Sequence, residues 1–454
     1  MIEIENKRFL VVGLGKTGLA TAKFLKRRGG VVTISDNAPA DALGELLDTA
    51  REMDVAIETG GHQAETIVAA DAILLSPGVP QTMPPLLEAA EKGIPVMGEM
   101  ELAARFMTKP IVAVTGTNGK TTTTTLIGEI LKDSGLHVFV GGNIGMPLIS
   151  FADKGENADI AVVEVSSFQL DTISTFRPRV AVLLNIAEDH LYRYDDFDAY
   201  VRSKGRIFEN QTRDDVAVIN VSDFHVLKAA KGAKSRRLYY NGGRNITDGA
   251  VADGKHIDIV ADGAVTAGVE VTSPALLATH NLENLSAAVL ASLAVGGTIA
   301  GIQTAVDKFG GLAHRLQYVD TIDQVAYFDD SKATNPDAVR RALAFFLCPV
   351  ILVMGGEDKG CDYGVLKNAI REHARAVVLI GEAKERIRSC INGAVPICEA
   401  ETMAEAVRRA RQLAESGDAV LLSPACSSFD MYESYARRGE DFCNAVKAIK
   451  EAMA

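Results

Sequence analysis

The sequence predicts an α/β protein of three domains, each built on a largely parallel sheet covered by helices. At about 150 residues per domain, the 454 residues correspond to about three domains. Short apolar runs alternate with helical stretches in three separate parts of the chain, which is typical of parallel sheets. Because 47% of the residues are hydrophobic and 23% are charged, the chain can form several ordinary cores.

The first domain is expected over residues 1–98. Apolar runs predict strands over 8–12, 31–35 and 71–76, and a helix is expected over 17–28. This strand–helix alternation predicts a Rossmann-like N-terminal domain.

The second domain is expected over residues 99–312. Strands are predicted over 111–115, 159–165 and 179–185, and a helix is predicted to start near Lys120. Three Asp-Gly pairs, at 248–249, 253–254 and 262–263, predict an antiparallel β appendage between 237 and 271, since Asp-Gly favours tight hairpin turns. Helices over 282–295 and 298–309 should follow, and Gly310-Gly311 should form a linker.

The third domain is expected over residues 313–454. Apolar runs predict strands over 325–329, 350–354, 376–380 and 419–423, with helices between them. This part of the chain is therefore also predicted to be Rossmann-like.

Composition excludes several classes of protein. The net charge of −12 argues against a general nucleic-acid or membrane-surface binder. No run of 18 apolar residues is present and the N-terminus does not resemble a signal peptide, so we expect a protein of the cytoplasm without membrane insertion. The six cysteines form no C-x-x-C pair, and we expect reduced and mostly buried thiols.

A Gly-rich turn, GLGKTG at 13–18, lies between the first predicted strand and helix. Its glycines allow a phosphate to approach the free N–H groups of a helix N-terminus. Asp36, about 20 residues further on, can bind a ribose hydroxyl in such folds. These features predict nucleotide binding, with NAD and a UDP-sugar both open; the alternative is that the glycines are purely structural.

A second Gly-rich turn, TGTNGKT at 115–121, is the stronger signal. Its backbone can surround phosphates, Lys120 can reach the transferred phosphate, and Thr121 can bind magnesium. Val114 occupies the position where an ordinary Walker A motif has glycine. We nevertheless expect ATP binding here, and two nucleotide-type loops suggest a phosphoryl transfer that activates a second substrate.

Candidate metal ligands follow the next strands. Glu164 ends an apolar run, and an acid at this position beside a P-loop usually holds magnesium; the alternative is a helix cap. From local sequence alone, His190 is more often a structural histidine, and Lys204 more often a surface lysine paired with an acid such as Asp189 or Glu209.

Taken together, the ordered motifs resemble those of the Mur ligase family over essentially the whole chain. They are GLGKTG, SPGVP (76–80), GTNGKTT (116–122), GGNIG (141–145), EVSSFQLD (164–171), NIAEDHLYRY (185–194), HNLENLSAA (280–288), HR (314–315), DDSKATNP (329–336), GGEDKG (355–360) and LLSPACSSFD (421–430). Several of them are shared with folylpolyglutamate synthetases. SSFQLD, SKATNP and SPACSSFD resemble those of the member that adds D-glutamate to UDP-N-acetylmuramoyl-L-alanine.

The resemblance implies an N-terminal UDP-substrate domain, a central P-loop ATPase-type domain and a C-terminal domain for the amino acid and ATP. It implies an ADP-forming amide ligase of bacterial peptidoglycan precursor synthesis. The substrate carboxylate would attack the γ-phosphate to give an acyl phosphate, from which the amine of D-glutamate displaces phosphate. It also implies two magnesium ions and a carbamylated Lys204. We expect a monomer.

By position in the motifs, the resemblance assigns roles to individual residues. Catalytic roles would belong to Lys120, His190 and Lys204. ATP would contact Gly116, Thr117, Asn118, Gly119, Lys120, Thr121, Thr122, Asn281, Asn284, Arg315 and Asp330. The UDP substrate would contact Gly15, Lys16, Thr17, Asp36, Ser76, Pro77, Gly78, Asn143 and Ser166. D-Glutamate would contact Lys332, Thr334, Lys359, Ser428 and Phe429. Magnesium would bind Thr121, Glu164, His190 and Lys204.

Four other readings compete with this one. Another Mur ligase is disfavoured because no arginine-bearing motif for a diamino acid is evident, and a folylpolyglutamate synthetase shares only some of the motifs. An NAD-dependent dehydrogenase would leave GTNGKT and Glu164 unexplained. A non-catalytic nucleotide sensor would have no need to retain Lys120, Glu164, His190 and Lys204 together.

Overall fold

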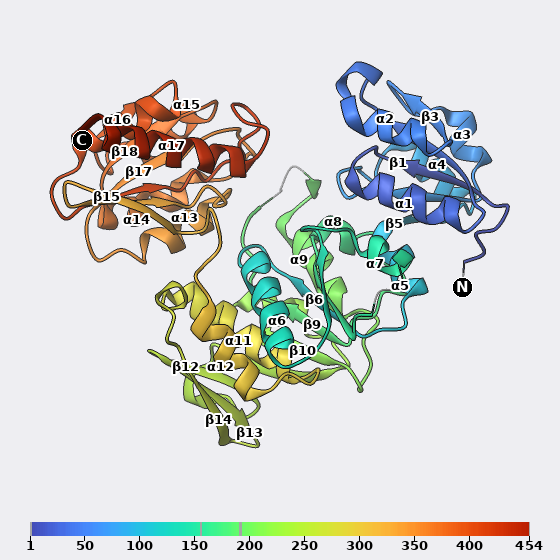
Figure 1. Ribbon diagram of the computed structural model, residues 1–454, viewed down its shortest axis with the longest axis horizontal. Coiled ribbons are helices and arrows are strands. Elements are labelled where there is room, and N and C mark those ends of the chain that lie inside the picture. The colour runs from blue at the N-terminus through green and yellow to red at the C-terminus, as the bar shows by residue number, and fades with distance from the viewer. Residues whose placement is uncertain (1, 155–156, 190–192, 454) are drawn as a thin grey trace. The chain divides into compact units, whose positions relative to one another are not determined.

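The computed structural model describes residues 2–154, 157–189 and 193–453 (Figure 1). By its internal contacts the described chain forms two compact units. The first unit comprises residues up to 186, 198–272 and 282–308, and contains two sheets. The second comprises 187–197, 273–281 and the residues from 309 onward, and contains the third sheet.

The first sheet is five-stranded and wholly parallel. Its strands, in order across the sheet, are β3 (Ala56–Thr59), β2 (Val31–Asp36), β1 (Arg8–Val12), β4 (Ala72–Leu75) and β5 (Val96–Gly98). Its helices are α1 (Lys16–Arg27), α2 (Gly44–Glu52), α3 (Ala64–Ala69) and α4 (Pro84–Glu91). Strand order reverses on either side of β1, which is where ligands bind in such folds. The predicted Rossmann-like N-terminal fold is confirmed.

The second sheet has nine strands. In order they are β14 (Ala264–Glu270), β13 (His256–Ala261), β12 (Gly249–Asp253), β11 (Arg236–Tyr240), β10 (Val216–Asn220), β9 (Val180–Leu183), β6 (Ile111–Thr115), β8 (Ile160–Glu164) and β7 (Val138–Gly142). Its helices are α5 (Glu99–Phe106), α6 (Lys120–Asp133), α7 (Leu148–Lys154), α8 (Ser167–Leu170), α9 (Phe197–Gly205), α10 (Phe224–Ala229), α11 (Thr279–Leu293) and α12 (Ile299–Lys308). The strands from β11 to β7 are parallel, and β6 is buried along its whole length, as a parallel central strand requires.

The β appendage differs from the expectation at one of its three turns. Asp253-Gly254 and Asp262-Gly263 lie in the hairpins that join β12, β13 and β14. The prediction for Asp248-Gly249 was wrong, because β12 pairs in parallel with β11 and Gly249 is the first residue of β12. A Cβ at Gly249 would lie 1.7 Å from the carbonyl oxygen of Tyr239, so this glycine permits close strand pairing.

The third sheet has six strands. They are β15 (Gln317–Ile322), β16 (Val325–Asp329), β20 (Ala419–Leu422), β17 (Val350–Gly355), β18 (Ala374–Ile380) and β19 (Ile397–Glu399). Its helices are α13 (Pro336–Leu343), α14 (Lys367–His373), α15 (Lys384–Ile391), α16 (Met403–Leu413) and α17 (Tyr435–Met453). We predicted neither edge strand: β15 runs antiparallel to β16, and β19 runs parallel to β18.

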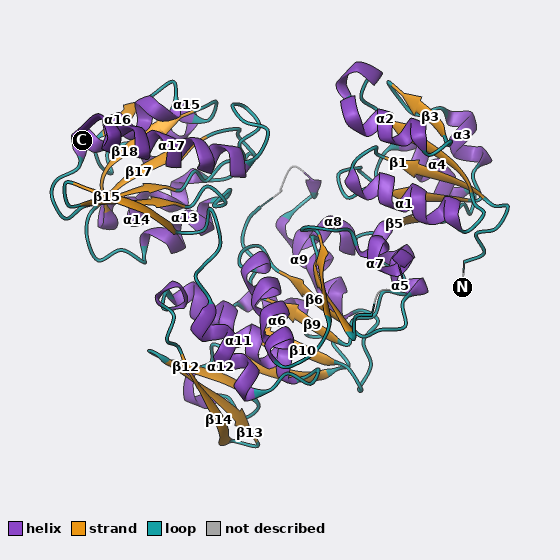
Figure 2. Ribbon diagram, viewed as in Figure 1, coloured by secondary structure: helices purple, strands orange, loops and turns teal. Residues whose placement is uncertain are grey.

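Alternating side chains of β17 fill two cores, one on each face of the third sheet. Leu352 and Met354 pack with residues of α13, α14 and α15, whereas Ile351 and Val353 pack with residues of α16 and α17. Helices accordingly cover both faces of this sheet (Figure 2). A continuous apolar run is what a strand buried on both faces requires.

Two expectations about the chain's chemistry can be compared with the structure. All six cysteines are free thiols, but only Cys361 and Cys426 are buried, so the expectation of mostly buried thiols was wrong. Burial nevertheless raises the pKa of Cys426 to about 12. No helix in the described ranges is both long and apolar enough to cross a membrane.

Candidate active site

The Gly-rich turn of the first sheet connects β1 to α1 at the switch point. A Cβ at Gly18 would lie 2.0 Å from the carbonyl oxygen of Gly13, so Gly18 allows α1 to start close to the strand. Among the described residues, apart from its own chain neighbours, nothing lies within 4 Å of a Cβ placed on Gly15, the N-cap of α1. Lys16 and Thr17 form the first turn of this helix. The open N-terminus of α1 is suited to a phosphate group.

Asp36 at the end of β2 shapes this turn. Its Oδ2 accepts a hydrogen bond from the Leu14 N–H at 2.6 Å, and its Oδ1 accepts one from the Ala38 N–H at 2.8 Å. Ser76 Oγ donates to the carbonyl of Gly13 at 3.0 Å, which joins the loop after β4 to the same turn. The predicted UDP-substrate residues of the first sheet therefore lie around one turn.

The loop after β4 also lies close to α8. A narrow crevice in the first unit is lined by Ser76 and Pro77 on one side and by Phe168 and Gln169 on the other. Ser166 caps α8, since its Oγ accepts from the N–H of Gln169 in a reciprocal capping box. This hydroxyl has a structural role that the motif alone did not reveal.

The second Gly-rich turn joins β6 to α6 as predicted. Lys120 Nζ donates to the carbonyls of Gly116 and Thr117, both at 2.9 Å. Asn185, which we did not assign to the site, fixes the loop: its main-chain carbonyl accepts from the Thr117 N–H and its side chain accepts from the Asn118 N–H. The loop therefore has a defined shape with its lysine folded over it.

Thr121 and Glu164 come together at the carboxyl ends of β6 and β8. Thr121 Oγ1 donates to Glu164 Oε2 at 2.8 Å, and Asn143 Nδ2 donates to Glu164 Oε1 at 3.0 Å. Glu164 does not cap α8, because Ser166 does so. A hydroxyl and a carboxylate oxygen are the donors that magnesium prefers, so these residues fit the ion.

Lys204, which lies on α9, reaches the same loop. It is 2% exposed, and its Nζ donates to the Gly116 carbonyl at 2.8 Å and lies 4.7 Å from the ring centroid of Tyr200. Glu209, one of its two candidate partners as a surface lysine, pairs instead with Arg206. Lys204 is therefore no surface lysine. His190 lies outside the described residues.

Asn284 on α11 closes the loop from the other side. A Cβ on Gly119, whose φ is +84°, would lie 2.2 Å from Asn284 Oδ1. Asn281, one turn earlier, belongs to the second compact unit, and its side chain donates to the carbonyl of Ala275 at 2.8 Å. Thr122, in the first turn of α6, is buried.

In the second unit, the predicted residues follow three neighbouring parallel strands. Asp330, Lys332 and Thr334 come after β16, Ser428 and Phe429 after β20, and Lys359 after β17, and these three strands are adjacent in the sheet. Their carboxyl ends form one edge, so the three motifs meet there. Ser428 is buried, whereas Phe429 is 69% exposed.

Asp330 is a buried carboxyl group. It accepts hydrogen bonds from Ser423 Oγ at 2.9 Å and from the N–H of Leu316, next to Arg315, at 3.2 Å. Burial raises the pKa of Asp330 to about 7. The structure thus places Asp330 beside the turn that carries Arg315.

Sequence reasoning missed a role for Asp189 in the second unit. Its Oδ1 lies 3.6 Å from Lys359 Nζ, and its Oδ2 accepts from Asn335 Nδ2 at 3.4 Å. Asn335 also caps α13. Asp189 lies in the motif at 185–194 and Asn335 in the motif at 329–336, and membership of these motifs is the sequence signal that could have indicated both residues.

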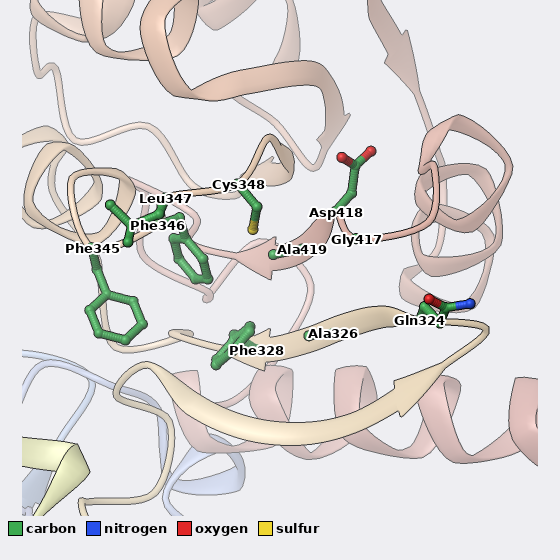
Figure 3. Close-up of a pocket in the computed structure, with 10 residues that line it drawn as sticks. All are labelled: Gln324, Ala326, Phe328, Phe345, Phe346, Leu347, Cys348, Gly417, Asp418 and Ala419. Carbon is green, nitrogen blue, oxygen red and sulfur yellow. The ribbon is translucent and has the colours of Figure 1, made fainter.

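A cavity of about 440 Å³ in the second unit is separate from this edge (Figure 3). Its walls include Phe328, Phe345, Phe346 and Cys348, with Asp418 immediately before β20. It lies towards the amino ends of β17 and β20, opposite the edge that carries Asp330 and Ser428. The cavity is therefore not part of the predicted site.

No three His, Cys, Asp or Glu side chains gather as a metal cluster within residues 2–154, 157–189 and 193–453. Thr121 can supply a hydroxyl oxygen and Glu164 a carboxylate oxygen, so this pair contains only one acid. A magnesium site completed by water and substrate phosphates needs no larger cluster of acids.

Comparison with known proteins identifies the class to which this fold and site belong. Three family models match, described as "Mur ligase MurD-like, N-terminal domain" over 7–98, "Mur ligase middle domain" over 114–292 and "Mur ligase, glutamate ligase domain" over 314–426. The chain belongs to the Mur ligase family.

Two relatives and one solved structure illustrate the similarity. The chain is 69% identical to UDP-N-acetylmuramoylalanine--D-glutamate ligase of Desulfosudis oleivorans, over 99% of this chain and 98% of the relative. It is 44% identical to the enzyme of that name from Desulfatibacillum aliphaticivorans, over 99% and 100%. A pseudomurein peptide ligase type C from Methanothermus fervidus shares the fold, with a TM-score of 0.62 and 20% identity over 99% of this chain and 100% of that chain.

Proposed function

We propose that this chain is an ATP-dependent ligase that adds D-glutamate to UDP-N-acetylmuramoyl-L-alanine in peptidoglycan precursor synthesis. The observation that carries the proposal is the 69% identity, over nearly the whole of both chains, to a relative named for this reaction. The motif loops of the two compact units, which hold the predicted residues at strand ends, support it. Neither the dehydrogenase nor the sensor reading accounts for membership of a ligase family.

In the proposed reaction the substrate carboxylate attacks the γ-phosphate of ATP, and the amine of D-glutamate then displaces phosphate from the acyl phosphate. When ATP binds, Lys120 would break its hydrogen bonds to the carbonyls of Gly116 and Thr117 and bind the phosphate. An ammonium stabilises charge on a transferring phosphoryl group. Asn281, Asn284, Arg315 and Asp330 would hold the nucleotide.

Magnesium would neutralise phosphate charge when bound. Thr121 and Glu164 would hold one ion, and we propose that His190 and a carbamylated Lys204 hold a second. Lys120 and Lys204 donate to the same carbonyl, so their ammonium groups lie near each other. The position of Lys204 beside the phosphate-binding loop supports this proposal, because the anionic oxygens of a carbamate suit magnesium.

D-Glutamate would bind at the carboxyl edge of the third sheet, through Lys332, Thr334, Lys359, Ser428 and Phe429. The UDP substrate would bind at the turn around Asp36. We propose a UDP-substrate-binding domain over 1–98, a central ATPase-type domain over 99–312 and a C-terminal amino-acid/ATP-binding domain over 313–454. We further propose that the protein acts in the bacterial cytoplasm as a monomer.

The proposal is tested by measuring phosphate release with ATP, magnesium and UDP-N-acetylmuramoyl-L-alanine in the presence of each member of a panel of D- and L-amino acids. Release should require the UDP substrate and D-glutamate together. Equal rates with L-glutamate or L-alanine, or release without an amino acid, would contradict the assignment.

A further inference from the structure

The first turn of α17 lies against the turn that carries Lys332. The carbonyl of Tyr435 accepts a hydrogen bond from Ser331 Oγ at 2.8 Å. The Nζ of Lys332 lies 3.6 Å from the centroid of the Tyr435 ring. An ammonium over an aromatic face at this distance is attracted by the ring quadrupole.

Arg438, one turn further along α17, stabilises this arrangement through hydrogen bonds. It is fully buried; its Nε donates to Ser331 Oγ at 3.0 Å and its Nη2 donates to the Ser331 carbonyl at 2.9 Å. The same guanidinium donates to the carbonyls of Cys426 at 3.0 Å and Ser427 at 2.9 Å. Arg438 therefore ties α17 to the turns that precede Lys332 and Ser428.

The other surroundings of the ring are also defined. The imidazole of His314 packs edge-on against Tyr435, with 6.1 Å between ring centroids, and the His314 carbonyl accepts from the Lys332 N–H at 3.1 Å. A Cβ on Gly439 would lie 2.2 Å from His314 Nδ1, so α17 packs tightly here. The ring of Tyr435 thus contacts both the imidazole of His314 and the ammonium of Lys332.

We propose that the ring of Tyr435 is a positioning group that holds the ammonium of Lys332 for a carboxylate of the incoming amino acid; this rests on the proposed function. A π face attracts the ammonium without carrying a net charge of its own. The ring can therefore orient Lys332 without itself neutralising the charge that a substrate carboxylate would meet. Phenylalanine at 435 would serve equally, since its ring has the same face.

The test measures kcat and KM for D-glutamate in variants at 435. Tyr435→Leu should raise this KM by roughly 3- to 30-fold, with unchanged KM for ATP and the UDP substrate. Tyr435→Phe should restore the affinity. Phenylalanines with one, two and three ring fluorines should then raise KM stepwise, because fluorine weakens the quadrupole with little change in shape.

Two controls separate positioning from folding. Tyr318→Leu removes an exposed aromatic ring from β15, and it should leave the KM unchanged. The Hε protons of Lys332 should show an upfield ring-current shift in the NMR spectrum of the wild type and of Tyr435→Phe, and lose it in Tyr435→Leu. This readout does not depend on activity.

A flat fluorination series in an enzyme that turns over D-glutamate, or an unshifted Lys332 resonance, would overturn the inference and leave the proposed function intact. Absence of D-glutamate-dependent turnover in the wild type would overturn the proposed function, and the role of Tyr435 with it.

Discussion

The ammonium groups of Lys120 and Lys204 donate to one oxygen, the main-chain carbonyl of Gly116. Lys120 belongs to the phosphate-binding loop itself, whereas Lys204 reaches it from α9. This position is relevant to the proposed carbamate of Lys204, whose anionic oxygens would suit magnesium.

Substitution of Lys204 tests the carbamate. Lys204→Ala should be nearly inactive and should regain part of its phosphate release when a small carboxylate such as formate is added. Lys204→Arg should stay inactive, because a guanidinium keeps its charge and is not carbamylated. A carbamate resonance should appear in the ¹³C NMR spectrum of the wild type with labelled bicarbonate and be absent from both variants. An active Lys204→Arg enzyme would refute the assignment.

Lys359 should determine affinity for D-glutamate. Its ammonium lies 3.6 Å from Asp189 and its side chain is 14% exposed, so loss of the cation leaves substrate charge poorly paired in a largely buried place. Such a loss costs about 2–5 kcal/mol. Lys359→Ala should strongly raise the KM for D-glutamate and leave that for the UDP substrate almost unchanged. Thermal unfolding of the variant serves as the control for stability, because Asp189 also loses its ion-pair partner.

The hydroxyl of Thr121 should set the magnesium requirement. Thr121→Val removes one of the proposed ligands, and the magnesium concentration for half-maximal phosphate release should rise by about tenfold or more. Thr124→Val is a matched control on α6, because Thr124 Oγ1 is buried and has no hydrogen-bond partner among the described residues. An equal magnesium response in the two variants would count against Thr121 as a ligand.

Glu99 should make stability depend on pH. It is 3% exposed and accepts from the Ile149 N–H, and burial raises its pKa from 4.5 to about 7. Folding therefore takes up a proton between these values, and the free energy of unfolding should fall by up to about 3 kcal/mol as pH rises from 4.5 to 7.

Urea unfolding of Glu99→Gln measures this contribution. The amide oxygen can still accept from Ile149, but the variant has no proton to lose, so its advantage over the wild type should grow from pH 4.5 to pH 7 and then level off. Glu88→Gln, on the exposed side of α4, should follow the wild type. Parallel curves for Glu99→Gln and the wild type would show that Glu99 ionises normally.

Much of the fold followed from local patterns. Apolar runs predicted β1, β6 and β16 to the residue, because strands buried on both faces contain few polar residues. The edge strand β15 was missed, since QYVDTI mixes polar and apolar residues and gains its stability by pairing with β16. The hairpin predicted at Asp248-Gly249 was wrong, because an Asp-Gly pair fits a hairpin turn but is equally compatible with the close parallel pairing of β12 with β11 that the chain adopts.

By itself the sequence determined the three α/β sheets, the two Gly-rich turns and the residues to examine, because spacing and side-chain chemistry are local properties of the chain. Only the tertiary structure decided which groups meet. Lys204 shares an acceptor with Lys120, Asp189 faces Lys359, and the Tyr435 ring covers Lys332. These pairs are distant in sequence, so no local pattern encodes them. Lys204 and Tyr435 meet their partners because helices pack back against the loops at the strand ends, and Asp189 meets Lys359 because residues 187–197 pack with the second unit.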